Sequence, residues 1–317
     1  MENNKQAVVL LNMGGVNSLS EVSVFLKNMF CDPYILPIKS NFIRSMVANF
    51  IVNKRLEEAK ENYKKIGGKS PLVEHTFKLT KTLESLDSSY FYTYAMRYTP
   101  PFAPMVVKEL QTKGIEEIVL FSMYPHFSYT TIASSYDDFI KALKSANYNP
   151  KITYIKHYYD FEPYNKCIVS SIKNTLKNDN SKEFHLIFSA HSLPQRNIKL
   201  GDPYKDEIEK NVEILKEMLR ANNLEFASIK IAYQSKIGPI KWLEPNLSDI
   251  IPKYKDKKLL IYPISFTIDN SETDYELKIE YKNLAQESEL LEYRVADCFN
   301  FGEEFAKCIL ELIRSKV

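Results

Sequence analysis

The sequence contains VLFSMYPHFSYTT at residues 119–131 and LLIYPISFTIDNSET at residues 259–273, and in both an apolar run reaches Tyr-Pro and opens into a polar loop. Continuous apolar runs of this kind are typical of parallel strands that are covered on both faces. Two further apolar runs end in unusual loops, LLNMGG at 10–15 and FSAHSLP at 188–194. This repetition indicates that the two halves of the chain share one α/β organisation.

Eight short runs are predicted to be strands, four in each half, with amphipathic helices between them. They are residues 7–12, 91–98, 117–124, 151–157, 185–190, 228–234, 258–266 and 292–297. The pattern predicts an α/β fold of two Rossmann-like, doubly wound domains whose parallel sheets face a ligand cleft. We expect the domains at 1–155 and 156–300, with a terminal helix at 301–317 that packs back on the first half.

The composition excludes several classes of protein. The 317 residues carry 42 Lys and Arg against 40 Asp and Glu, a net charge of +2, so we expect no nucleic-acid partner. The N-terminus lacks a basic region followed by an apolar run, and no stretch reaches the ~18 apolar residues of a spanning helix, which predicts a cytoplasmic protein. The four cysteines are too scattered for a metal or disulfide framework.

Glycine is scarce, with 8 residues where average usage of about 7% would give roughly 22. Four of the eight form the pairs Gly14-Gly15 and Gly67-Gly68. A chain with so few glycines is expected to keep them where the backbone requires them.

An insertion at residues 33–71 interrupts the first half. Within it, an apolar face is flanked by basic residues, which predicts a helix with two possible roles. The apolar residues are Phe42, Ile43, Met46, Val47, Phe50 and Ile51, and the basic ones are Lys39, Arg44, Lys54 and Arg55. The helix either packs on the domain core, or residues 37–55 form a lip that touches a membrane surface or covers an apolar ligand.

Two groups of residues are candidates for chemistry. His191 lies where a predicted strand passes into a loop, and it is either a hydrogen-bonded core residue or a proton acceptor or metal ligand. Carboxylates follow the seventh strand, and Glu272 and Glu276 share one helix face at a spacing of four. These acidic residues are either a solvated helix start, favoured by the helix dipole, or part of a cation or proton pathway.

Taken together, the motifs resemble those of the ferrochelatase family, which inserts ferrous iron into a porphyrin to make haem. The matching segments are LLNMGG (10–15), FLKNMFCDPYILP (25–37), YKKIGGKSPL (63–72), MRYTPP (96–101), YPHFSYTTIASS (124–135), FSAHSLP (188–194), GDPY (201–204), AYQSKIGPIKWLEP (232–245) and PISFTIDNSET-YEL-IEY (263–281). The resemblance implies two Rossmann-like domains around a porphyrin cleft and a metal-inserting lyase of the last part of haem biosynthesis.

Residue by residue, the resemblance implies that His191 and Glu272 are catalytic and meet the metal, facing each other across the macrocycle. Glu276 and Asp269 would continue a proton relay to solvent. The positions expected at the porphyrin are Met13, Arg97, Tyr98, Tyr124, Ser128, Ser235, Trp242 and Phe266. Protoporphyrin IX is the expected porphyrin, and the expected partners are this small molecule and divalent iron.

Two departures from the family pattern concern ring nitrogens. Asn270 stands where many relatives carry a second histidine, so a mechanism that needs two histidines is in doubt. His126 stands where relatives usually carry Gln. With only four scattered cysteines, we expect no iron–sulfur cluster and no prosthetic group. We expect a monomer, since the sequence has no obvious interface signal.

Three alternatives remain open at the level of sequence. The first is a chelatase for another tetrapyrrole or metal, such as one that inserts iron into coproporphyrin or one that inserts cobalt. The second is a non-catalytic tetrapyrrole carrier, which would not need His191 and Glu272. The third is a nucleotide-binding doubly wound protein, against which the missing glycine-rich fingerprint counts.

Overall fold

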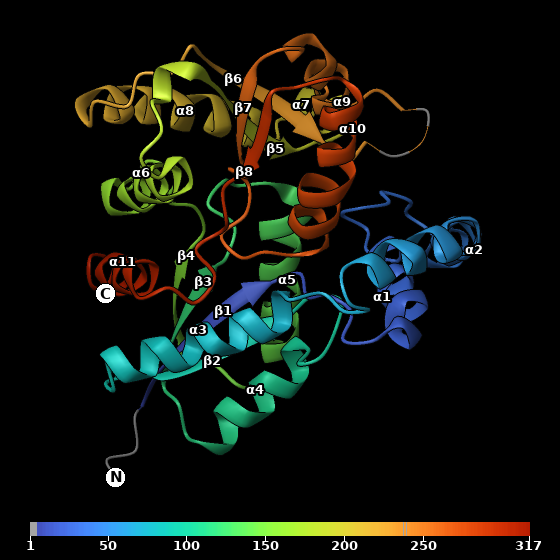
Figure 1. The fold of residues 1–317 in the computed structure, drawn as a ribbon. Helices are drawn as coiled ribbons and strands as arrows, with labels where there is room; N and C mark the ends of the chain where they lie inside the picture. The colour runs from blue at the N-terminus through green and yellow to red at the C-terminus, as the bar shows by residue number, and fades with distance from the viewer. Residues whose placement is uncertain (1–4, 237, 239) are drawn as a thin grey trace. The chain divides into compact units, whose positions relative to one another are not determined.

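A computed structural model describes residues 5–236, 238 and 240–317 (Figure 1). Residues 1–4, on which the expected absence of a signal peptide partly rests, lie outside the described residues. Positions 237 and 239, which belong to the motif at 232–245, also lie outside them. The chain divides into two compact units. Unit 1 comprises Met1–Tyr124, Ser128–Lys156 and Asn300–Val317, and unit 2 comprises Pro125–Phe127 and His157–Phe299.

Each unit contains one parallel sheet of four strands, and the two sheets have the same topology. The first has the order β2 (Phe91–Met96), β1 (Gln6–Asn12), β3 (Glu117–Ser122), β4 (Lys151–Ile155). The second has the order β6 (Ser228–Gln234), β5 (Phe184–His191), β7 (Lys258–Tyr262), β8 (Glu292–Val295). The predicted α/β fold with two parallel sheets is therefore confirmed, and all eight predicted strands are present.

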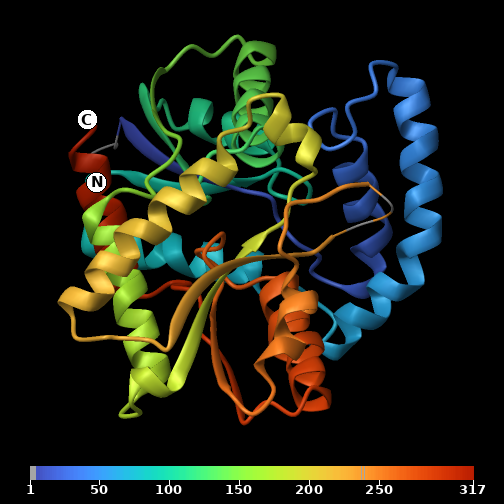
Figure 2. The same ribbon diagram turned by 90° about the horizontal axis from the view of Figure 1, so that it is seen from above.

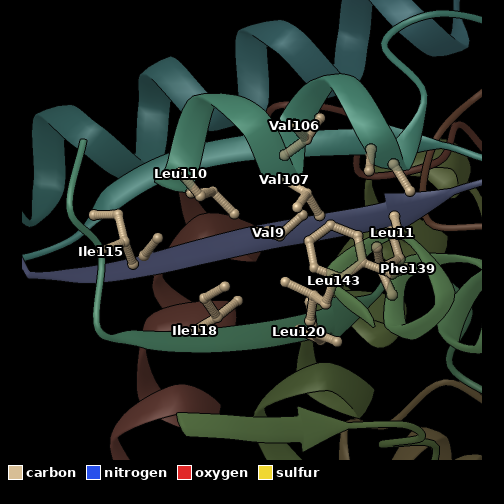
Figure 3. Close-up of a cluster of buried hydrophobic side chains, with 14 residues drawn as sticks. Val9, Leu11, Val106, Val107, Leu110, Ile115, Ile118, Leu120, Phe139 and Leu143 are labelled. Atoms are coloured by element: carbon tan, nitrogen blue, oxygen red, sulfur yellow. The ribbon is translucent and has the colours of Figure 1, made fainter. Parts of the chain in front are cut away.

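Unit 1 contains both helices that pack on its sheet and helices that lie beside it. They are η1 (Leu19–Glu21), α1 (Val22–Phe30), α2 (Asn41–Lys65), α3 (Leu72–Leu86), α4 (Ala103–Thr112), the short π-helix η2 (Tyr129–Ala133), α5 (Ser134–Ser145) and α11 (Glu303–Arg314). Of these, α1 and α2 lie beside the sheet. Figure 3 shows α4 and α5 packed on β1 and β3, with Val107 and Phe139 against Val9 and Leu120. The last helix, α11, packs on α3, and its Arg314 Nη2 donates to Asp87 Oδ2 at 2.9 Å.

Unit 2 repeats this construction around its own sheet. Its helices are α6 (Glu162–Leu176), η3 (Ser181–Glu183), α7 (Gln195–Lys199), α8 (Tyr204–Ala221), α9 (Leu247–Ile250), η4 (Ile251–Tyr254), η5 (Glu272–Glu280) and α10 (Tyr281–Glu287). Leu277 of η5 and Tyr281 of α10 are buried against Ile187 and Ile261 of the sheet. The segment η5 is a π-helix, so its residues follow a wider turn than in an α-helix.

The helix predicted within the insertion is α2, which packs along α1 (Figures 1 and 2). The predicted apolar face is only partly correct, because Ala48 and Val52 form the buried side. Phe42 and Phe50 are exposed, at 73% and 71%, and Ile43 and Met46 are exposed with them. The alternative of a fully core-packed helix is therefore wrong for these four side chains.

Arg44 was expected to flank the apolar face as a basic residue, and this expectation is wrong. Its side chain is buried, and its Nε and Nη1 atoms donate to the carbonyls of Cys31 and Ile38 at 2.8 and 2.6 Å. These bonds tie α2 to the segment that precedes it. Among the described residues, we find no helix both long enough and apolar enough to cross a bilayer.

Candidate active site

His191 is the last residue of β5, and its imidazole meets the carboxylate of Glu272 at the start of η5. The distance from Nδ1 of His191 to Oε2 of Glu272 is 3.1 Å, and both side chains are partly buried. The two residues belong to the same unit and contact each other directly. The prediction that they face each other across a macrocycle is wrong for this arrangement, since an imidazole and a carboxylate at hydrogen-bond distance leave no room for a porphyrin between them.

Glu276 lies about one turn after Glu272 on the same face of the π-helix and completes an acidic cluster beside His191. Its Oε2 accepts hydrogen bonds from the hydroxyl of Ser235 and, at 3.3 Å, from Nε2 of Gln234. Burial, followed by the neighbouring charge of Glu272, raises the pKa of Glu276 to about 7. A carboxyl with this pKa exchanges protons near neutral pH.

The acidic neighbours also act on His191. Burial on its own lowers the pKa of the imidazole, but the charge and hydrogen bond of Glu272 and the charge of Glu276 outweigh it, and the pKa lies above its ordinary value. Phe266 packs edge-on to the imidazole with its ring centre 6.3 Å away. The cluster therefore combines a base, His191, with two carboxylates whose charges act on it.

Asn270 has a structural role that the sequence did not reveal. Its Oδ1 accepts from the backbone N–H of Glu272 at 2.8 Å and from that of Thr273 at 3.4 Å. In return, the hydroxyl of Thr273 accepts from the backbone N–H of Asn270 at 2.9 Å. The asparagine thus satisfies N–H groups at the beginning of the π-helix and orients the residue that contacts His191.

Asp269, which was expected to continue a proton relay, lies in a cluster of ion pairs around Lys278. It is buried, and its Oδ1 lies 3.4 Å from Nζ of Lys278, which also contacts Asp274 and Asp297 at 3.0 Å. We therefore assign Asp269 to a structural ion-pair cluster at the base of η5.

In unit 1, two expected porphyrin contacts are buried and engaged within the protein. Tyr98 is 4% exposed, and its hydroxyl donates to Oδ2 of Asp32 at 2.9 Å. Ser128 is also buried, and its side chain accepts from the backbone N–H of Thr130 at 3.2 Å, at the start of η2. Both side chains are buried here, and their contact with the porphyrin stays a prediction.

Arg97 is only partly buried, but its charge is already balanced. Its guanidinium contacts Oδ2 of Asp32 at 2.9 Å and Oδ1 of Asp138 at 3.4 Å, and its Nε donates to Ser134 at 2.9 Å. Sequence reasoning missed Asp32, although the residue lies inside one of the quoted motifs. The available signal was an acidic residue within an otherwise apolar stretch.

The remaining expected porphyrin positions are distributed over both units. In unit 1, Met13 is half-buried, and its N–H donates to the hydroxyl of Tyr124 at 3.1 Å. In unit 2, Ser235 contacts Glu276, and the carbonyl of Trp242 accepts from Nε2 of Gln195 at 3.0 Å. The structure therefore brings Ser235 and Phe266 to the histidine, whereas Met13 and Tyr124 form a separate group.

The sequence as a whole matches the family model described as Ferrochelatase over residues 5–317. The chain belongs to the ferrochelatase family. A ferrochelatase of Wolinella succinogenes is 54% identical over 309 residues, covering 98% of each chain. A ferrochelatase of Helicobacter acinonychis (strain Sheeba) is 51% identical over 312 residues, covering 98% of this chain and 92% of the relative.

Solved structures of more distant proteins share the fold of this chain. SirB from Bacillus subtilis, solved with Fe3+, has a TM-score of 0.59 at 10% identity and covers 98% of this chain and 95% of its own. A second structure, a sirohydrochlorin chelatase SirB with cobalt from Bacillus subtilis subspecies spizizenii, has a TM-score of 0.58 at 9% identity, covering 98% and 94%. At such identities the likeness concerns the fold alone.

For a member of the ferrochelatase family, the metal is substrate, and the arrangement of donors is informative. Within the described part of the chain, no group of three or more His, Cys, Asp and Glu side chains is arranged to hold a metal ion. The imidazole and carboxylate of His191 and Glu272 form a pair of donors that is already closed by its own hydrogen bond. Among the described residues, His191 and Glu272 therefore form a two-donor pair and not a preformed metal cage.

Proposed function

We propose that this chain is an enzyme that inserts ferrous iron into a porphyrin to give haem and releases two protons. Family membership over nearly the whole chain supports the reaction class. The observation that carries the proposal is the 3.1 Å contact of His191 with Glu272, beside a glutamate with a pKa of about 7. These groups can accept and pass on protons at neutral pH, which a carrier would not require.

The contact with Glu272 supports a separate role for each ring nitrogen of His191. With Glu272 ionised, Nδ1 carries the hydrogen that the carboxylate accepts, which leaves the lone pair of Nε2 to take a proton from a pyrrole nitrogen. The imidazolium that forms is stabilised by the charges of Glu272 and Glu276. The Nδ1 proton then passes to Glu272, which leaves a neutral ring with its hydrogen on Nε2. That hydrogen must pass to solvent, and Nδ1 must regain one from the acidic pair, before Nε2 can take the second pyrrole proton.

Glu276 continues the path away from His191. Its raised pKa of about 7 makes it an acceptor for protons that reach Glu272, and Ser235 and Gln234 hold its carboxylate in place. Ferrous iron, as substrate, would approach the same donors once the protons have left. We propose protoporphyrin IX as the porphyrin; parallel turnover assays with protoporphyrin and coproporphyrin would decide between the two.

We also propose that the exposed apolar face of α2 (Phe42, Ile43, Met46 and Phe50) makes peripheral contact with a membrane surface. The four side chains lie on one side of the helix. Replacing Phe42 and Phe50 by Ser should lower binding to lipid vesicles in a flotation assay. The matched control is Phe77→Ser, because Phe77 is also exposed but lies on α3. Equal loss in both variants would exclude this role for α2.

We propose a cytoplasmic, monomeric enzyme. All four cysteines are free thiols and three are buried, as expected in a reducing compartment. His191 and Glu272 come from the same chain, so the site needs no residue from a second copy.

The activity itself is tested by mixing the protein with porphyrin and ferrous iron without oxygen. Appearance of the metalloporphyrin absorbance supports the enzyme, and porphyrin binding without that change would support a carrier.

A further inference from the structure

The backbone of His191 lies beyond the point where the neighbouring strand has ended. On one side, β5 pairs with β6 up to His191 itself. On the other side, β7 stops at Tyr262, opposite Phe188, and the next residue is Pro263, which has no N–H group. The N–H of His191 therefore has no strand partner on the β7 side and needs another acceptor.

A serine and a tyrosine hydroxyl occupy this place. The N–H of His191 donates to Oγ of Ser265 at 3.0 Å, and the hydroxyl of Tyr204 donates to the carbonyl of His191 at 2.9 Å. The two hydroxyl oxygens are 2.6 Å apart. Tyr204 and Ser265 are 6% and 5% exposed, so water does not compete strongly for these bonds.

Counting donors gives the direction of every bond. Tyr204 has one hydroxyl hydrogen, which it uses on the carbonyl of His191, so Ser265 must donate to Tyr204. Ser265 in turn accepts from the N–H of His191. The hydrogen bonds form a closed circuit that begins and ends on the backbone of His191, and bonds in such a chain strengthen one another.

We propose that Tyr204 and Ser265 are positioning residues that fix the backbone of His191, so that Nδ1 stays on Glu272 while Nε2 remains directed at the substrate. This inference rests on the proposed function. Neither residue touches the imidazole itself through these bonds. Burial raises the pKa of the Tyr204 phenol, which keeps it protonated and able to donate.

His126, one of the two departures from the family pattern, packs against the ring of Tyr204. The ring of His126 lies edge-on to that of Tyr204, with centres 6.3 Å apart, and its Nε2 is 3.0 Å from Oδ1 of Asn211. Burial lowers the pKa of His126 to about 3, so this ring stays neutral. The contact gives Tyr204 an uncharged, fixed support.

The test replaces only hydroxyl groups, in Tyr204→Phe and Ser265→Ala. We expect kcat for metal insertion to fall by about 10- to 100-fold with an unchanged KM for porphyrin, because misplacement of a catalytic group by a fraction of an ångström has effects of this size. In parallel, NMR titration of His191 in the full chain should give a lower pKa in both variants, since the contact with Glu272 loosens. The variant Ser265→Thr retains a hydroxyl and should restore most of kcat.

Tyr254→Phe is the matched control. Tyr254 is also 6% exposed in unit 2, and its hydroxyl has no hydrogen-bond partner among the described residues. The double variant Tyr204→Phe/Ser265→Ala should lose no more activity than the worse single variant, because each change opens the same circuit. Additive losses, or the same loss in Tyr254→Phe, would overturn the inference.

The two proposals fail differently. If His191→Ala retains turnover, the proposed function fails. If His191→Ala loses turnover while Tyr204→Phe and Ser265→Ala keep normal kcat and a normal His191 pKa, only the positioning role is wrong. If Tyr204→Phe does not fold, the comparison of Ser265→Ala with Ser265→Thr decides alone, and equal kcat in these two would contradict the proposal.

Discussion

Nδ1 of His191 lies 3.1 Å from Oε2 of Glu272, although 81 positions separate the two residues in the chain. The end of a strand and the start of a π-helix create this contact, and Asn270 fixes the helix end by accepting the N–H of Glu272. The imidazole and the carboxylate therefore work as one coupled unit. The predictions below follow from that unit and from the elements that hold it.

Glu272→Gln should lower the pKa of His191. The change removes the charge and the charged hydrogen bond that raise this pKa, while the burial that lowers it remains. Glu276→Gln should lower it by a smaller amount, because Glu276 acts through charge alone. NMR titration of the His191 ring measures both shifts. An unchanged or higher pKa in Glu272→Gln would contradict the assignment.

Glu276→Gln should stabilise the fold at pH 8 relative to the unchanged protein. In the folded state the pKa of Glu276 is raised from 4.5 to about 7, so folding takes up a proton and stability falls as pH rises through this window. The variant has no such loss, and its relative stability should increase by about 3 kcal/mol between pH 4.5 and 8. Urea unfolding at the two pH values gives this difference, and the account is wrong if the gap stays constant.

Asp32→Asn should destabilise unit 1 by about 3 kcal/mol, because it leaves the guanidinium of Arg97 with a weakened partner in a partly buried site. Arg97→Leu strands the buried carboxylate in the same way. The double variant Asp32→Asn/Arg97→Leu removes both charges and should cost less than the sum of the single changes. Thermal and urea unfolding of the three variants would show this, and strictly additive losses would exclude the pairing.

Gly14→Ala should be much more damaging than Gly67→Ala. Both glycines have positive φ angles, +86° and +89°. A Cβ on Gly14 would lie 2.2 Å from Oγ1 of Thr99, whereas one on Gly67 meets nothing within 4 Å. The Gly67 change therefore measures backbone strain alone, about 1 kcal/mol, and Gly14→Ala adds a steric clash. Similar unfolding midpoints for the two variants would contradict this reading.

The strands were predictable because buried parallel strands have continuous apolar runs, which solvent-exposed segments lack. The position of His191 at the end of a strand was also predictable, since it directly follows such a run. The orientation of side chains beyond the strand ends was not. Tyr98 and Arg97 both follow β2, but their partner Asp32 comes from a segment 66 residues away from Tyr98, so no local pattern reveals that their polar groups are already satisfied.

The sequence also did not predict correctly which face of a helix is buried. The apolar residues of α2 suggested one broad face, but Ala48 and the aliphatic stem of Arg44 take part in the buried side, so Phe42 and Phe50 are left exposed. In η5 the limit is different. Residue spacing alone does not distinguish its π-helical hydrogen bonding from an α-helix, and the contact of Glu276 with Ser235 joins residues 41 positions apart, so it could not be inferred.

The most direct test of the central claim is metal insertion by His191→Ala and Glu272→Gln, with porphyrin binding measured in the same samples. We expect each variant to bind porphyrin with near-normal affinity and to lose iron and zinc insertion by at least about 100-fold. His185→Ala, at the opposite end of the same strand, is the control and should keep its activity. Near-normal turnover in either His191→Ala or Glu272→Gln would contradict the account.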